Sequence, residues 1–198
     1  WGVREIAFTG GEPFMNPEII EMLRRSLARG YDVLVLTNAM SPMMRPRMQD
    51  GIKQLVETYG DKLTLRVSLD HHSAAVHDAE RGAGAFDKSL TGMHWLASVG
   101  ARLAVAGRIE MAESEAEARS GYAALYAAHG FDIDAAHPGM TVLFPEMDPS
   151  VAVPEITTAC WGILNKSPAE VMCSSSRLVL KRQGAPPPAV PACPPPPY

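Results

Sequence analysis

Cysteine is scarce in this chain, and the spacing of the few cysteines excludes several kinds of site. Only Cys160, Cys173 and Cys193 occur among 198 residues. An odd number of widely spaced cysteines does not form a disulfide framework, so we expect a reducing, cytoplasmic setting. No apolar run approaches the roughly 18 residues that a membrane-spanning helix needs, which argues against a membrane association.

Positive charge is also limited. The chain carries 18 Lys and Arg residues against 22 Asp and Glu residues, a formal net charge of −4. Proteins that bind the phosphates of nucleic acids need a basic surface, so no nucleic-acid partner is expected. Apolar residues make up 46% of the chain, which is enough for the packed core of an ordinary globular protein.

Strand-like and helix-like segments alternate from the start of the chain. Short apolar runs predict strands, and longer segments with apolar residues at helical spacing predict helices. The strands are predicted at 3–8, 33–36, 63–69 and 103–105, and the helices at 17–29 (with Asn16 as N-cap), 46–59, 86–99 and 113–129. A fifth strand is expected within 131–144. Successive strand–helix units predict a parallel sheet with outer helices, either a partial barrel or a doubly wound sheet.

The carboxyl-terminal part of the chain has a different composition. The alternation stops after Pro145, and eight prolines fall within the last 13 residues, which we expect to be extended or disordered. We therefore predict two parts, residues 1–145 and residues 146–198. The chain begins at Trp1 with a strand already in progress, so we expect it to be a piece of a longer protein.

Polar residues follow the first predicted strand. Gly10 and Gly11 allow a backbone with positive φ and a close approach of a ligand, and Pro13 stiffens the turn. Glu12 places a carboxylate where ligands bind in parallel α/β folds, and a carboxylate can accept hydrogen bonds from a ligand ammonium group. These residues also fit a plain strand-to-helix turn, so other segments must decide between the two interpretations.

The segment 9–13, Thr-Gly-Gly-Glu-Pro, resembles the GGEP motif of radical S-adenosylmethionine (SAM) enzymes. Thr37-Asn38 is similar to the Thr-Asn-Gly at the next strand end of that family, with Ala39 in place of the glycine. Ser68-Leu69-Asp70 is similar to the family's Ser-Leu-Asp-Gly, with His71 in place of the glycine. Arg81-Gly82 and Gly107-Arg108 then follow in the order found in that family.

This resemblance implies a partial (β/α) TIM-like barrel, truncated at its amino terminus, that binds SAM. It implies that Glu12 binds the SAM ammonium group and that Arg108 pairs with the SAM carboxylate. The implied SAM-binding residues are Gly10, Gly11, Glu12, Pro13, Thr37, Asn38, Ser68, Asp70 and Arg108. In the intact protein a [4Fe–4S] cluster, reduced by a donor such as flavodoxin or ferredoxin, would cleave SAM to a 5′-deoxyadenosyl radical. That radical would abstract hydrogen from a small-molecule or peptide substrate.

The cluster-binding loop of that family is absent from this sequence. The loop has the pattern CxxxCxxC and precedes the GGEP motif, but only nine residues precede Gly10 and none is cysteine. The cluster ligands are therefore expected outside this chain, which by itself should be catalytically inert. Segments 144–147, 160–162 and 172–174 resemble a subset of the family whose extension binds an auxiliary iron–sulfur cluster. That subset implies Cys173 and Cys193 as ligands; the alternative is that these cysteines, like Cys160, are structural.

Two other functions remain open at this stage. The chain could be another barrel or doubly wound enzyme that binds a phosphate ligand at its strand ends, or a SAM-binding module without catalytic activity. Three histidines, His71, His72 and His77, lie near one another in sequence. Adjacent histidines seldom point the same way and no Cys or Glu completes a metal-binding geometry with them, so a solvated loop is expected there and not a metal site.

Overall fold

The computed structural model describes residues 2–148, 150–152, 157–170, 172–181 and 188–190. The chain divides into two compact units, residues 1–148 and residues 149–198. The second unit contains α6 (Cys160–Ile163), the 3-10 helix η3 (Pro168–Glu170) and α7 (Met172–Ser175). Among the described residues, no helix combines the length and apolar character needed to cross a membrane.

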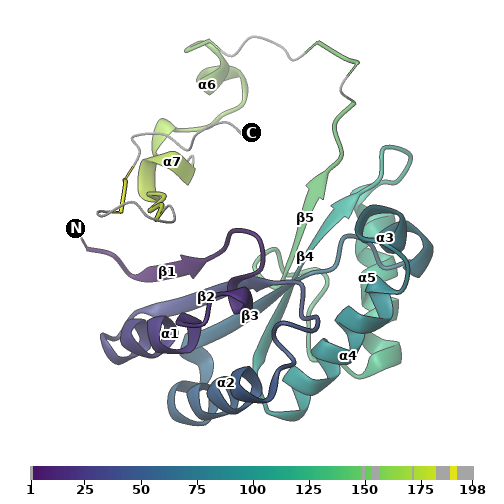
Figure 1. Cartoon of the computed structure of the whole chain (residues 1–198). Helices are drawn as coiled ribbons and strands as arrows, with labels where there is room; N and C mark the ends of the chain where they lie inside the picture. Colours follow the sequence, from purple (N-terminus) through teal and green to yellow (C-terminus); the bar gives the residue numbers. More distant parts are fainter. Residues whose placement is uncertain (1, 149, 153–156, 171, 182–187, 191–198) are drawn as a thin grey trace. The chain divides into compact units, whose positions relative to one another are not determined.

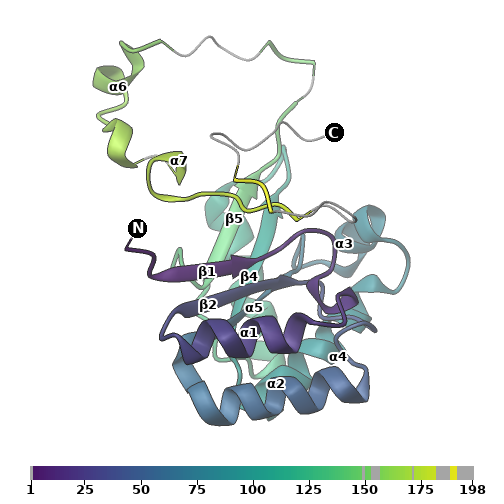
Figure 2. The ribbon, with the colours of Figure 1, turned by 60° about the vertical axis from the view of Figure 1, so that its left-hand side comes forward.

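The first unit is built on a five-stranded parallel sheet (Figure 1). The strands are β1 (Glu5–Phe8), β2 (Asp32–Thr37), β3 (Leu63–Ser68), β4 (Arg102–Ile109) and β5 (Thr141–Pro145). They lie in the sheet in chain order. Helices cover one face, and the sheet curls away from them as a half-barrel (Figure 2). The parallel α/β fold is confirmed, and the single helical layer identifies it as a partial barrel and not a doubly wound sheet.

The α-helices of this unit follow the predicted pattern with one exception, and two short 3-10 helices were not predicted. They are η1 (Pro13–Met15), α1 (Ile19–Ala28), α2 (Pro46–Tyr59), η2 (Gly60–Lys62), α3 (Ala74–Arg81), α4 (Ala85–Ser98) and α5 (Glu115–His129). The bounds of α2 agree with the prediction. Helix α1 begins two residues later than predicted, because the Asn16 side chain accepts a hydrogen bond from the Glu18 N–H at 2.9 Å and forms a turn first.

Helix α3 is the exception, because a solvated loop was predicted where it lies. The His77 side chain is fully buried, and Asp70 and His71 are also buried. The Asp78 carboxylate accepts hydrogen bonds from the Gly84 and Phe86 N–H groups, so it joins the end of α3 to the start of α4. Residues 74–81 are therefore helical, with His77 buried and Asp78 bound to the backbone of the next helix, and the prediction of a solvated loop is wrong.

The hydrophobic core lies between the sheet and its helical layer. Val35, Leu65, Val67 and Val105 are fully buried on the face that the helices cover. The helices contribute fully buried side chains from α1, α2, α4 and α5, among them Leu23, Ile52, Met93, Leu96 and Tyr122. Burial of this apolar area is the main favourable term in folding, and it fixes the carboxyl ends of the strands where the candidate site lies.

Candidate functional site at the carboxyl edge of the sheet

The Glu12 carboxylate joins the ends of β1 and β2. Its two oxygens accept hydrogen bonds from the Thr37 hydroxyl at 2.9 and 3.0 Å, and Oε2 accepts one from the Asn38 N–H at 2.8 Å. Oε1 also accepts from the Phe14 N–H at 3.1 Å. An ionised carboxylate offers about four acceptor positions, so three donors leave room for another. Within the described residues no cation forms an ion pair with Glu12.

The turn after β2 explains why a glycine is favourable at position 39. Ala39 has φ +57°, in the left-handed region where glycine is unstrained, and its N–H donates to the Thr37 Oγ1 at 3.0 Å. The Asn38 carbonyl accepts a hydrogen bond from the Ser89 hydroxyl of α4 at 2.9 Å. The backbone around Thr37 and Asn38 is therefore held from both sides.

Gly10 and Gly11 have the backbone conformation that the sequence suggested. Their φ angles are +102° and +56°, and a Cβ added at either position would meet no atom within 4 Å. Glycine is needed here for the φ angle and not for internal packing. The space beside both residues is open to a ligand. Pro13, which follows Glu12, is buried and begins η1.

Asp70, beyond the end of β3, is bound to Arg81 of α3. The carboxylate accepts hydrogen bonds from Arg81 Nε at 2.5 Å and Nη2 at 2.8 Å, a bidentate pair. The Asp70 carbonyl accepts from the Arg108 N–H at 2.7 Å, which connects β3 to β4. The structure therefore brings Asp70 and Arg108 together through the backbone. Ser68 is the last residue of β3 and is half-buried.

The Arg108 side chain is exposed near the same edge. Its Nη1 atom lies 3.4 Å from Glu80 Oε2, and both side chains are close to half exposed. An exposed ion pair at this distance contributes little free energy, so Arg108 can exchange Glu80 for another anion at small cost.

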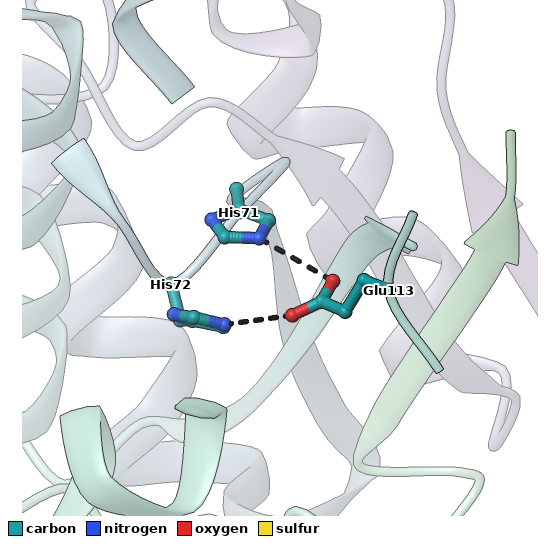
Figure 3. A group of neighbouring side chains, drawn as sticks. All are labelled: His71, His72 and Glu113. Atoms are coloured by element: carbon teal, nitrogen blue, oxygen red, sulfur yellow. Dashed lines mark hydrogen bonds and ion pairs between the residues drawn. The ribbon is translucent and has the colours of Figure 1, made fainter. Parts of the chain in front are cut away.

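A second polar cluster lies beyond the ends of β3 and β4 (Figure 3). The His71 Nε2 atom lies 3.4 Å from Glu113 Oε2, and the His72 Nε2 atom lies 3.1 Å from Glu113 Oε1. Glu113 was predicted to begin the helix at 113–129. It lies instead just before the N-cap, Ser114, which forms a capping box with Glu117. Sequence reasoning missed the cluster because 41 residues separate His72 from Glu113; the adjacency of the two strand ends was the available signal.

The cysteines give no cluster site among the described residues. Cys160 is a free cysteine of intermediate exposure, and its structural role stays a prediction. Cys173 belongs to α7, but its side chain, like all of Cys193, lies outside the described residues. The assignment of Cys173 and Cys193 to an auxiliary cluster therefore stays a prediction, as does most of the proline-rich end.

The residues at the sheet edge fit part of the expected cofactor set. A carboxylate without a cation and two open glycines suit the amino group of an amino-acid-like ligand such as SAM. A [4Fe–4S] cluster needs a closely spaced set of thiolates, and the spacings between residues 160, 173 and 193 do not provide one. This chain accordingly fits SAM recognition but does not supply the cluster ligands.

Comparisons of sequence match this chain to a family model and to proteins of known function. The family model described as the radical SAM superfamily matches residues 1–109, more than half of the chain. The AdoMet-dependent heme synthase of Nitratidesulfovibrio vulgaris is 30% identical over 99 residues, covering 48% of this chain and 24% of that protein. The antilisterial bacteriocin subtilosin biosynthesis protein AlbA of Bacillus subtilis is 35% identical over 81 residues, covering 41% of this chain and 17% of that protein. The matches thus span less than a quarter of either relative.

A solved structure shows the same fold. Streptococcus suis SuiB matches with a TM-score of 0.55 at 12% identity, covering 81% of this chain and 34% of that one. The S-adenosylmethionine-bound form of SuiB matches with a TM-score of 0.54 at 12% identity. The form bound to the precursor peptide SuiA matches with a TM-score of 0.52 at 11% identity. At this identity the likeness concerns the fold alone.

Proposed function

The chain belongs to the radical SAM superfamily, and on that basis we propose that its sheet edge recognises SAM, with Glu12 binding the ammonium group. The observation that carries the proposal is the Glu12 carboxylate, which three neutral donors hold in place while no described cation neutralises it. A fixed, uncompensated carboxylate favours a ligand cation, and an ammonium group supplies both the charge and the hydrogen-bond donors.

The other predicted residues take positions consistent with this role. Gly10 and Gly11 offer open backbone beside Glu12, and Pro13 begins the helix that orients it. Thr37 and Asn38 hold the carboxylate, so we propose that they orient Glu12 as well as line the site. Ser68 would line the ribose side.

Asp70 and Arg108 complete the proposed SAM site. The Asp70 carboxylate is already bound by Arg81, so we propose that it contributes by fixing the turn after β3. Arg108 would exchange its exposed contact with Glu80 for the SAM carboxylate.

For the whole protein we propose radical SAM catalysis of the oxidoreductase type. When bound, SAM and a [4Fe–4S] cluster supply one-electron chemistry that ends in hydrogen abstraction by a 5′-deoxyadenosyl radical. We propose that the cluster ligands lie outside this chain and that flavodoxin or ferredoxin is the electron donor. The relatives include a heme synthase and a bacteriocin biosynthesis protein, and SuiB binds a precursor peptide, so both a small molecule and a peptide remain candidate substrates.

Calorimetric titration of the chain with SAM tests the role of Glu12. We expect weak, saturable binding that Glu12→Gln reduces roughly tenfold or more, because a hydrogen bond to a charged group contributes about 1.5–3 kcal/mol. Glu18→Gln is the matched control, since Glu18 is an exposed residue in the same segment between β1 and α1. This variant should bind SAM with the affinity of the parent. Equal SAM affinity of the parent and Glu12→Gln would contradict the proposal.

Family membership disfavours the phosphate-binding alternative, whereas a SAM-binding module without catalysis is a second outcome to distinguish. The full-length sequence decides between catalysis and binding. Three upstream cysteines in CxxxCxxC spacing are expected; a full-length chain without them would contradict the radical mechanism and leave the SAM-binding proposal intact.

A further inference from the structure

His71, His72 and Glu113 form a compact group of metal-ligand atoms. His71 and His72 follow β3, Glu113 follows β4, and the three ligand atoms all lie within 4.8 Å of one another. Both imidazoles turn their Nε2 atoms toward the same carboxylate (Figure 3). We propose that these three side chains bind a divalent transition-metal ion of the Zn²⁺ type, independently of the SAM site.

The ligand atoms lie close enough together for such an ion to bind after small shifts of the side chains, since all three lie within 4.8 Å of one another. Zn²⁺ binds imidazole nitrogen and carboxylate oxygen at about 2.0–2.2 Å, and a tetrahedral arrangement then places neighbouring ligand atoms about 3.3 Å apart. His72 Nε2 lies 3.1 Å from Glu113 Oε1, and His71 Nε2 lies 3.4 Å from the other carboxylate oxygen, Oε2. Two imidazoles and a carboxylate suit Zn²⁺, Co²⁺, Ni²⁺ and Fe²⁺, and leave a position open for water or another ligand.

Glu113 has an acceptor that the protein does not satisfy. Its Oε2 atom is buried and has no hydrogen-bond partner among the described residues. His71 Nε2 lies 3.4 Å away, but the two atoms do not form a hydrogen bond. A buried carboxylate oxygen without a donor is unfavourable, and a metal ion between the imidazoles and the carboxylate would satisfy it.

The His72 ring packs against helix α5 at Gly121. A Cβ added at Gly121 would collide with the His72 imidazole, so a residue with a side chain there would displace the ring. Glycine in a helix interior is less stable than alanine. At position 121 the nearby His72 ring explains why a glycine is present. The edge of the His72 ring also meets Tyr122, with ring centroids 5.6 Å apart. The place of the His72 ring beside Glu113 thus depends on the absence of a side chain at Gly121.

The metal-free state of His71 gives the proposal a second readout. The Ser73 N–H donates to His71 Nδ1 at 2.9 Å, so the neutral ring carries its proton on Nε2, which faces Glu113. Coordination through Nε2 requires that proton to reside on Nδ1 instead. The Ser73 N–H then loses its acceptor. Because Ser73 is the N-cap residue of α3, metal binding should change the environment of the backbone N–H at the start of that helix.

Titration of the 198-residue chain with Co²⁺, followed by visible absorption and by calorimetry, tests the site. We expect one Co²⁺ per chain, with no thiolate charge-transfer band in the near ultraviolet, and competition by Zn²⁺. His72→Gln and Glu113→Gln should each weaken binding by about tenfold or more, since even residues that only support a metal ligand commonly change affinity 10–100-fold. Far-ultraviolet circular dichroism checks that both variants fold.

His94→Gln is the matched control. His94 Nε2 lies 3.0 Å from His129 Nδ1; His94 is exposed and His129 is partly buried. This variant should bind Co²⁺ as the parent does. The ¹⁵N–¹H signal of Ser73 should move on addition of diamagnetic Zn²⁺ to the parent. Absence of stoichiometric binding, binding unchanged in His72→Gln and Glu113→Gln, or an unmoved Ser73 signal with one Zn²⁺ bound would each overturn the proposal, whatever the SAM titration gives.

Discussion

Asp70, which follows β3, connects this strand to α3 and β4 through three different groups. Its carboxylate binds Arg81 of α3, its N–H donates to His77 Nδ1 at 3.0 Å, and its carbonyl accepts from Arg108 of β4. Asp70 is buried, so loss of Arg81 would leave a desolvated charge without a partner, which is far more unfavourable than loss of an exposed pair. A Ser-Leu-Asp sequence at a strand end can therefore be a folding requirement as well as part of a ligand site.

His77 should make stability depend on pH. Burial lowers the pKa of His77 from its ordinary value near 6.5, because the charged ring is poorly solvated in the core. The folded protein then binds this proton more weakly than the unfolded chain does. Its contribution to stability is complete above pH 6.5 and is lost as the pH falls below that value. We expect the urea midpoint to fall between pH 7.5 and pH 5.

The variant His77→Gln isolates this contribution. Glutamine can still accept the Asp70 N–H but does not titrate, so the difference between the two urea midpoints should shrink. His137→Gln, at an exposed position, should keep the pH dependence of the parent. An equal decrease in the parent and in His77→Gln would rule out His77 as its source.

Two helices approach their neighbours at glycines. In α4, a Cβ at Gly92 would overlap the backbone oxygen of Ala39, the residue that follows Thr37 and Asn38. In α2, a Cβ at Gly51 would lie 2.7 Å from the Ile20 side chain of α1. A backbone atom cannot move without shifting the turn, whereas a side chain can change its rotamer. The packing of α4 thus supports the turn that holds Glu12.

Alanine at these two glycines should have unequal effects. Gly92→Ala should lower the free energy of unfolding by about 1–3 kcal/mol, the usual range for overpacking. Gly51→Ala should cost less, because Ile20 can adjust and alanine adds up to about 1 kcal/mol of helix propensity. Urea unfolding of both variants measures the difference. A loss at Gly51 equal to or larger than that at Gly92 would contradict this account of the α4 contact.

The sequence predicts an element well where its pattern is long and regular. Helix α2 has apolar residues at helical spacing over its whole length, and its observed bounds match. β4 is longer than predicted, because the small residues Ala106 and Gly107 and the charged Arg108 follow the apolar run at 103–105. α3 was missed because it has only eight residues, and its polar side chains bind partners at the strand end and in α4 that no local pattern reveals.

The site was predictable to the extent that strand order could be inferred. The motifs at residues 9–13 and 37–38 were expected to meet because parallel strands share a carboxyl edge, and Glu12 does contact Thr37 and Asn38. The binding of SAM by these residues stays a proposal. The contact of His71 and His72 with Glu113 needed the register of β3 against β4 and the packing of α5, which are properties of the folded chain.

The first unit should fold without the second. The residues of its buried core cluster all lie between Phe14 and Ala135. A chain ending at Asp148 keeps that whole cluster, so its urea midpoint and m-value should match those of the full 198 residues. Limited proteolysis should give a stable fragment ending near the same point. A lower midpoint in the shortened chain would show that residues after 148 contribute to the stability of the first unit.

The strand order β1-β2-β3-β4-β5 also bears on how the protein is made. Each new strand pairs with the one synthesised just before it, so a growing chain on the ribosome always presents a finished edge for the next strand. Parallel sheets that must bring together distant segments fold slowly, and this order avoids most of that cost in loop closure. The half-barrel can therefore grow in one direction during translation, with the Glu12 contact to Thr37 and Asn38 among the earliest long-range contacts to form.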